Sequence, residues 1–135
     1  MKFLFDNNLP AHLARAICEL SKRESDRVRE VIALCDRFSR NAPDSEWLAA
    51  LAQEGGWYIV SGDQFRKSDA EKELIRRSGL TVFVLHKSWS SHAYWAKAAQ
   101  MVAWWPRILD QASLAQKAAF RVPWRTQGKL EQIRV

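Results

Sequence analysis

The sequence predicts an α/β fold with a mainly parallel central sheet. Short apolar runs alternate with segments of helical period, and glycine, proline and asparagine turns separate the two. Strands that alternate with helices at this spacing imply right-handed crossovers and therefore parallel pairing. The chain has 135 residues, so we expect a single domain over 1–135, with an α/β core in 1–90 and a helix and tail in 91–135.

The N-terminal part is expected to form a strand, a helix and a second strand. Residues 2–5 are apolar, and Asn7-Asn8-Leu9-Pro10 then offers a turn with proline at the start of a helix. Apolar side chains recur every three to four positions, which predicts a helix over about residues 10–22. Residues 28–34 are bounded by charged sequence and suit a short buried strand.

Two further helix and strand pairs follow. Asp44 is expected to be the N-cap of a helix that ends at Gly55-Gly56, and residues 57–60 supply the third strand. Asp69 is the expected N-cap of the next helix, and residues 80–85 form the fourth and clearest strand.

A long tryptophan-rich helix is predicted over about residues 91–112, where it would cover one face of the sheet. Its apolar stripe includes Trp95 and Trp105, and Pro106 is expected to kink or interrupt it because proline lacks a backbone donor. Trp104 and Trp105 point about 100° apart on a helix, so we expect one of them near the surface. It would be a contact for another chain or, as the less favoured alternative, a platform for RNA stacking.

Positive charge is concentrated near the C-terminus. The chain has a formal net charge of +6, and residues 113–135 hold five cations against one acid. This balance favours a polyanionic partner, and Arg121 and Arg125 are candidates for contacts to a phosphate backbone. Alternating apolar residues over 120–124 predict an edge strand in this tail.

Other features limit the class of protein. No stretch approaches the roughly 18 apolar residues that span a bilayer, and Asp6 comes too early for a signal peptide, so we expect a cytoplasmic protein without membrane contact. Cys18 and Cys35 lack CxxC spacing, which argues against a disulfide scaffold or a structural zinc site.

Three aspartates are expected to meet at the carboxyl edge of the sheet. Asp6 follows the first strand, Asp44 opens the helix after the second, and Asp63 follows the third. Gathered carboxylates repel one another unless a cation compensates, and Mg²⁺ prefers oxygen ligands. A turn or a helix cap also explains each aspartate alone, but their coincidence at one edge favours a metal site.

Five neighbouring residues are candidates for the same site. Glu46, in the first turn of its helix, either adds a metal ligand or interacts only with the helix dipole. Asn7 and Asn8 either hydrogen-bond a phosphate or a metal-bound water, or simply form a turn. Arg66 and Lys67 either contact phosphate or form a solvated pair of charges.

Three short motifs carry a family resemblance. They are Lys2-Phe3-Leu4-Phe5-Asp6-Asn7-Asn8-Leu9-Pro10, Asp44-Ser45-Glu46-Trp47-Leu48 and Ile59-Val60-Ser61-Gly62-Asp63. In this order and spacing they resemble the PIN-like domain family, over about residues 1–90. The resemblance implies a three-layer α/β/α fold around a mainly parallel, four-stranded sheet, with the tryptophan-rich helix and basic tail added. In the family, acidic residues at the strand ends bind Mg²⁺ or Mn²⁺, which carries over to Asp6, Asp44 and Asp63.

The same resemblance implies a function. The chain would be a metal-dependent endoribonuclease that hydrolyses RNA phosphodiester bonds to 5′-phosphate and 3′-hydroxyl ends. Relatives include the toxin ribonucleases of bacterial toxin–antitoxin modules, which implies a cognate antitoxin protein as partner. The surface at Trp104 or Trp105 would then be a contact to that antitoxin or to a second copy in a homodimer.

The motifs depart from the family pattern at two places. Asn7 stands where related sequences often have glutamate, and Gln64 and Phe65 follow Asp63 where many have a second acid. Both departures remove ligand charge, so a noncatalytic nucleic-acid-binding or regulatory module is the alternative. A receiver-type phosphoacceptor is rejected because no second acid stands beside Asp6.

Overall fold

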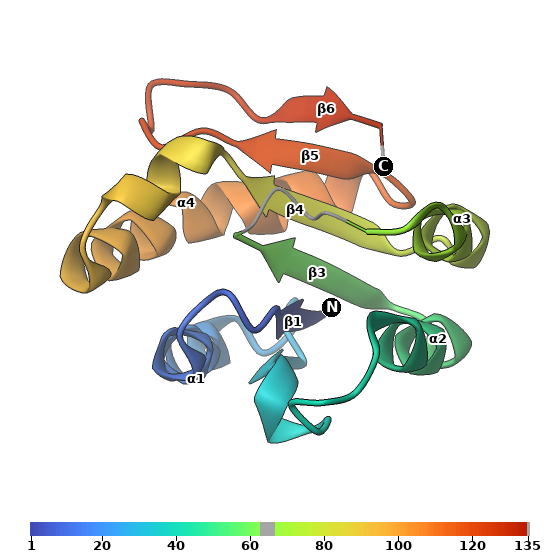
Figure 1. Cartoon of the computed structure of the whole chain (residues 1–135). Coiled ribbons are helices and arrows are strands. Elements are labelled where there is room, and N and C mark those ends of the chain that lie inside the picture. Colours follow the sequence, from blue (N-terminus) through green and yellow to red (C-terminus); the bar gives the residue numbers. More distant parts are fainter. Residues whose placement is uncertain (63–66, 135) are drawn as a thin grey trace.

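The computed structural model describes residues 1–62 and 67–134, and it has the predicted α/β fold with a mostly parallel sheet (Figure 1). The strands are β1 (Lys2–Phe5), β2 (Glu30–Ala33), β3 (Trp57–Ser61), β4 (Thr81–Leu85), β5 (Ala119–Val122) and β6 (Glu131–Ile133). The helices are α1 (Ala11–Ser21), α2 (Asp44–Glu54), α3 (Asp69–Ser78) and α4 (Tyr94–Leu114). Short 3₁₀ turns cover residues 22–24, 34–36 and 87–91.

The sheet is wider than the four strands predicted. Its order is β2-β1-β3-β4-β5-β6, and each neighbouring pair is parallel except the antiparallel pair β5–β6. The tail therefore supplies the expected strand, but that strand is not at the edge. The short β6 lies outside it, and its exposed residues Glu131 and Gln132 give no apolar run for a sequence pattern to detect.

Helices cover both faces of the sheet and make three layers (Figure 1). On one face, Phe3 and Phe5 join a cluster that includes side chains of α1 and α4. On the other face, Leu4 packs with side chains of α2 and α3. Successive residues of β1 thus pack against opposite helix layers, because side chains alternate between the two faces of a strand and both faces of this one are buried. The helix layers cover the faces of the sheet, and the loops that hold the candidate site lie at the carboxyl edge of the parallel strands.

The predicted N-caps are wrong by one residue. Asp44 and Asp69 are the first residues of α2 and α3, and Pro43 and Ser68 occupy the N-cap positions. At α3 the serine hydroxyl accepts from the Glu71 backbone N–H, 3.2 Å away, while the Glu71 carboxylate accepts from the Ser68 N–H. This reciprocal capping box needs the side chain one position before the aspartate.

The helix α4 runs without interruption through Pro106, contrary to the prediction. Pro106 lies on the exposed side, and the Val102 side chain four residues earlier is 45% exposed, so water can replace the missing hydrogen bond. The apolar stripe also differs from the predicted one, because Trp95 is 80% exposed.

Trp104 and Trp105 are both buried, at 0% and 5% exposed, so the expectation that one would lie near the surface is wrong. The Trp105 indole N–H donates to the hydroxyl of Ser21 at the end of α1, at 2.9 Å. The Trp104 indole N–H donates to the carbonyl of Trp124 in the tail, at 3.2 Å. The two indoles point in different directions, and each is therefore covered by a different segment, the end of α1 or the tail.

The described part of the chain also shows the state of its helices and of its two cysteines. Within residues 1–62 and 67–134, no helix has the length and apolarity that crossing a membrane requires. Cys18 and Cys35 are free thiols that pack, partly buried, against the cluster under α1 and α4.

Candidate active site

Asp6 lies at the carboxyl edge of the sheet, where β1 and β3 are neighbours. Its backbone N–H donates to the Val60 carbonyl at 2.9 Å, which holds it beside the end of β3. Its side chain is 8% exposed. Oδ1 accepts from the backbone N–H of Asn7 at 2.7 Å, and Oδ2 accepts from the Ser61 hydroxyl at 3.3 Å. These donors fix the orientation of a largely buried carboxylate.

Asp44 approaches the same place from the start of α2. Its side chain is 39% exposed, and Oδ1 accepts from the indole N–H of Trp47 at 3.0 Å. Trp47 is 1% exposed and belongs to the cluster under α2 and α3. Because the core fixes the indole, the indole fixes the carboxylate, and Oδ2 is the oxygen that faces a cation.

That cation is the ammonium of Lys67. Its Nζ lies 2.9 Å from Asp44 Oδ2 and 3.7 Å from Asp6 Oδ2. It also lies 5.5 Å from the centroid of the Trp47 ring, within range of a cation–π contact. The Lys67 side chain is 4% exposed, so the structure places it inside the acidic site and not in a solvated pair of charges.

Asn8 ties the ends of β1 and β3 together. Its side-chain carbonyl accepts from the Gly62 N–H at 2.7 Å, and its amide donates to the Ser61 hydroxyl at 3.5 Å. A Cβ at Gly62 would meet Asn8 Oδ1 at 3.1 Å, so glycine permits this close approach. Asn8 therefore helps to shape the site, whereas the Asn7 side chain is exposed beside it.

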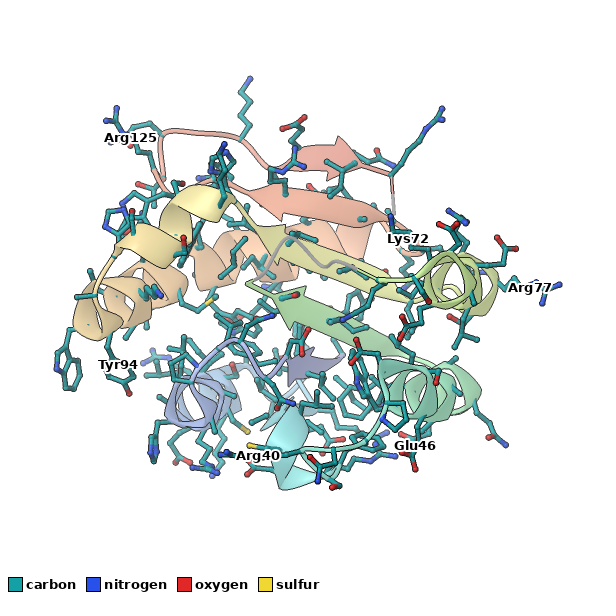
Figure 2. The ribbon with its side chains drawn as sticks, viewed as in Figure 1. Arg40, Glu46, Lys72, Arg77, Tyr94 and Arg125 are labelled. Carbon is teal, nitrogen blue, oxygen red and sulfur yellow. The ribbon has the colours of Figure 1, made fainter. Side chains whose placement is uncertain are left out.

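Five predicted site residues are not brought into this cluster by the described part of the structure. Asp63 and Arg66 lie outside the described residues. Glu46 is exposed in the first turn of α2 (Figure 2), and its side chain makes no hydrogen bond or ion pair within residues 1–62 and 67–134. Arg121 and Arg125 belong to the tail and are considered next.

The two tail arginines lie across the sheet from Asp6. Arg121 is on β5 and pairs with Glu131 of β6 at 3.5 Å. Since β4 separates β5 from β3, Arg121 is on the order of 10 Å across the sheet from the end of β3. Arg125 is exposed in the turn after β5 (Figure 2). Neither touches the acidic site, but both are accessible to a long polyanion that passes it.

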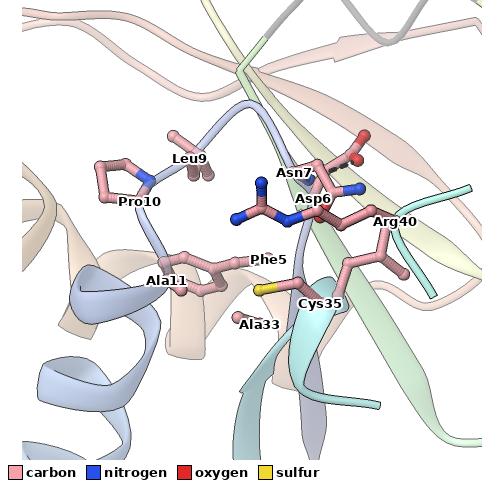
Figure 3. A pocket seen from close by; sticks show the side chains of 10 residues that line it. Phe5, Asp6, Asn7, Leu9, Pro10, Ala11, Ala33, Cys35 and Arg40 are labelled. Atoms are coloured by element: carbon pink, nitrogen blue, oxygen red, sulfur yellow. Dashed lines mark hydrogen bonds between the residues drawn. The ribbon is translucent and has the colours of Figure 1, made fainter. Parts of the chain in front are cut away.

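A pocket of about 410 Å³ lies beside Asp6, between the end of β1, the start of α1 and the residues that follow β2. The Arg40 side chain extends into it (Figure 3), and among the described residues Arg40 makes no hydrogen bond or ion pair. Sequence reasoning missed Arg40 because it stands in an irregular loop without a motif. The one available signal was an unassigned cation shortly before Asp44 in the sequence.

The described residues fit a hard cation. Oxygens of Asp6 and Asp44, which come from different elements, already converge on one ammonium. Carboxylate oxygens are the ligands that Mg²⁺ prefers, and one or two of them suffice when waters complete the shell. Within residues 1–62 and 67–134 no group of three or more Asp, Glu, His or Cys is placed to hold a metal. The third predicted ligand, Asp63, is outside that part.

A parallel α/β sheet with aspartates at its carboxyl edge is the arrangement that the sequence motifs predict for a PIN-like domain. A comparison with known families agrees with this prediction. The family model described as a PIN-like domain matches residues 1–87, from the start of the chain to just beyond β4. The chain therefore belongs to the PIN-like domain family, whose members are commonly nucleases. No curated protein and no solved structure matches the chain.

Proposed function

We propose that this chain is a metal-dependent endoribonuclease in which Asp6, Asp44 and Asp63 hold Mg²⁺ or Mn²⁺. The observation that carries the proposal is the convergence of Asp6 and Asp44 on one cationic group at the carboxyl edge of the sheet. Membership of the PIN-like family and the net charge of +6 support a nuclease with a polyanionic substrate.

The chain's own residues prepare the site for hydrolysis. Ser61 and the Asn7 N–H hold the Asp6 carboxylate, and Trp47 holds the Asp44 carboxylate. Fixed carboxylates of this kind need no reorganisation when a cation binds, which is the benefit of a preorganised site. A bound Mg²⁺ would supply activation of a water for in-line attack and stabilisation of negative charge on the phosphate.

RNA would lie over this edge of the sheet. Arg40 extends into the pocket beside Asp6 and is suited to a phosphate next to the scissile one. Arg121 and Arg125 would contact more distant phosphates, and Arg66 and Asn7 remain candidates for contacts near the scissile bond. Lys67 is directed at the two aspartates, so any contact it makes to phosphate would be within the acidic site.

The test is the chemistry of the products. Purified protein is incubated with structured and single-stranded RNA in Mg²⁺ or Mn²⁺, and the new ends are mapped by enzymatic end-labelling. The proposal expects 5′-phosphate and 3′-hydroxyl ends, because water attacks the phosphorus and the 3′ oxygen leaves. Ends that carry a 3′-phosphate or a 2′,3′-cyclic phosphate would contradict it, since the 2′-hydroxyl would then be the nucleophile.

The alternative is a noncatalytic nucleic-acid-binding module. Two observations favour it: Asn7 replaces a glutamate that relatives often carry, and the buried Lys67 already offsets part of the negative charge of Asp6 and Asp44. Salt-dependent RNA binding by folded protein, without cleavage at any Mg²⁺ or Mn²⁺ concentration, would establish this alternative.

We further propose the role of a toxin with a cognate antitoxin. The burial of Trp104 and Trp105 removes the surface first expected for the contact, and the exposed Trp95 at the start of α4 takes its place as the aromatic anchor. Light scattering should give a larger mass after the chain is mixed with the product of the neighbouring open reading frame. A mass equal to one chain both alone and in the mixture would contradict the proposed partner and the homodimer.

A further inference from the structure

Lys67 is unlike the other paired cations of the described chain. Its side chain is 4% exposed, whereas the Lys and Arg side chains of the remaining ion pairs are 31% to 79% exposed. A lysine is almost never fully buried unless opposite charge surrounds it. Here both carboxylates and the face of Trp47 surround the ammonium, so the fold holds a positive charge inside the acidic site.

The balance of charge limits what else this site can hold. The described carboxylates Asp6 and Asp44 carry two negative charges, and Lys67 carries one positive charge. One divalent cation would leave this group with an excess of one positive charge. Two would leave an excess of three positive charges, and Asn7, beside Asp6, supplies an amide and no further carboxylate. Like charges gathered in a largely buried space are disfavoured.

We propose that Lys67 is the resident cation of the site and takes the place of a second metal ion, so that the chain binds a single divalent cation. The inference rests on the proposed function, because it assumes that the aspartates bind a metal. It makes Lys67 a positioning residue, which holds Asp6 and Asp44 together and opposes entry of more positive charge.

Mn²⁺ binding tests this without reference to RNA cleavage. Wild type, Lys67→Met, Lys67→Gln and Lys67→Arg are titrated with Mn²⁺, and free Mn²⁺ is followed by electron paramagnetic resonance. Lys22→Met is the matched control, because it removes the same charge from an exposed lysine at the end of α1. Circular dichroism establishes that each variant is folded.

We expect wild type to bind one Mn²⁺ per chain, with no spectrum of two coupled ions. Lys67→Met and Lys67→Gln should bind Mn²⁺ at least about tenfold more tightly, because a unit positive charge beside the ion is removed. Lys67→Arg and Lys22→Met should stay within about twofold of wild type.

Two coupled ions in wild type would overturn the inference and leave the proposed nuclease intact, and this arm needs no variant to fold. Unchanged or weaker binding by both neutral Lys67 variants would also overturn it. Failure of wild type and of every variant to bind Mn²⁺ would remove the proposed metal site itself, and the inference with it. Binding by the neutral variants alone would also overturn it, because wild type would then hold no divalent cation.

Discussion

The Asp44 carboxylate is held at both of its oxygens, and each partner has a different physical origin. Trp47 is a core residue of α2 whose indole N–H donates to Oδ1, and Lys67 is a loop residue whose ammonium donates to Oδ2. A carboxylate with only 39% of its side chain exposed and two fixed partners samples few orientations. We therefore predict that the Trp47 indole increases the metal affinity of the site without contacting the metal itself.

Trp47→Phe tests this orientation. The ring is largely retained but the N–H donor is lost, so Mn²⁺ affinity should fall roughly tenfold, the lower end of the effect of losing such a supporting bond. Trp57→Phe is the matched control, because Trp57 is 3% exposed and its indole N–H donates to Glu54 instead. Equal losses of Mn²⁺ affinity in the two variants would show that general destabilisation, and not the orientation of Asp44, is measured.

Arg40→Ala tests the pocket beside Asp6. RNA binding should weaken, and the plot of log affinity against log salt should become shallower by about 0.7, the value for one phosphate contact on a single strand. Fluorescence anisotropy in EDTA measures this without cleavage. Arg77→Ala is the control, since Arg77 is 79% exposed on α3 and lies away from the pocket (Figure 2). An unchanged salt dependence in Arg40→Ala would contradict the assignment.

At the scale of elements, the end of α2 is tied to the loop after β2 by an ion pair. Arg37 donates to the Glu54 carboxylate, and the Trp57 indole N–H donates to it as well. The Arg37 hydrogen bonds, followed by that of Trp57, lower the pKa of Glu54 to about 2 from an ordinary value of 4.5. Gly55, with φ of 74°, then ends the helix as predicted and turns the chain into β3.

Glu54→Gln should show the effect of this pair on stability. Because the folded pKa lies below the unfolded one, the ionised carboxylate stabilises the fold above about pH 5, and the effect fades as pH falls towards 2. The difference in free energy of unfolding between wild type and Glu54→Gln should therefore shrink over this range in urea titrations. In an Arg37→Ala background the pH dependence of that difference should be smaller. A difference that grows on acidification would contradict the argument.

Pro106→Ala tests why α4 tolerates proline. Buried residues on both sides of Pro106, including Trp105 and Ile108, hold the helix against the sheet despite the missing backbone bond. Alanine restores the donor to an exposed position, so the free energy of unfolding should rise by about 1–3 kcal/mol in urea denaturation. A lower stability would mean that the proline ring itself contributes to the structure.

At the scale of the whole molecule, the four core strands and four helices could be predicted because each follows from a short-range pattern. Parallel order then brought Asp6 and Asp44 to one edge, since the carboxyl ends of such strands meet there. The tryptophan surface could not be predicted, because α1 and the tail are distant in sequence from Trp104 and Trp105 yet cover them. Long-range contacts of this kind leave no local pattern.

The role of Lys67 escaped sequence reasoning for a related reason. A lysine shortly before a helix is usually solvated, and only the approach of α2 to the end of β1 turns it into a buried counter-ion. The sequence predicts Asp44 both as a helix cap and as a carboxylate at the sheet edge, and its side chain contacts Trp47 and Lys67 instead of capping α2. Residues of the candidate site are thus where local rules and the folded structure differ most.

The most direct test of the account is the rate of RNA cleavage by wild type and Asp44→Asn as Mg²⁺ is added and then removed with EDTA. Cleavage should require Mg²⁺, and the asparagine variant should be at least about a hundredfold slower, because electrostatic stabilisation by a held metal is worth several kcal/mol. Asp110→Asn, which changes an exposed aspartate of α4, should cleave like wild type. Cleavage that survives EDTA, or an Asp44→Asn enzyme as fast as wild type, would contradict the central claim.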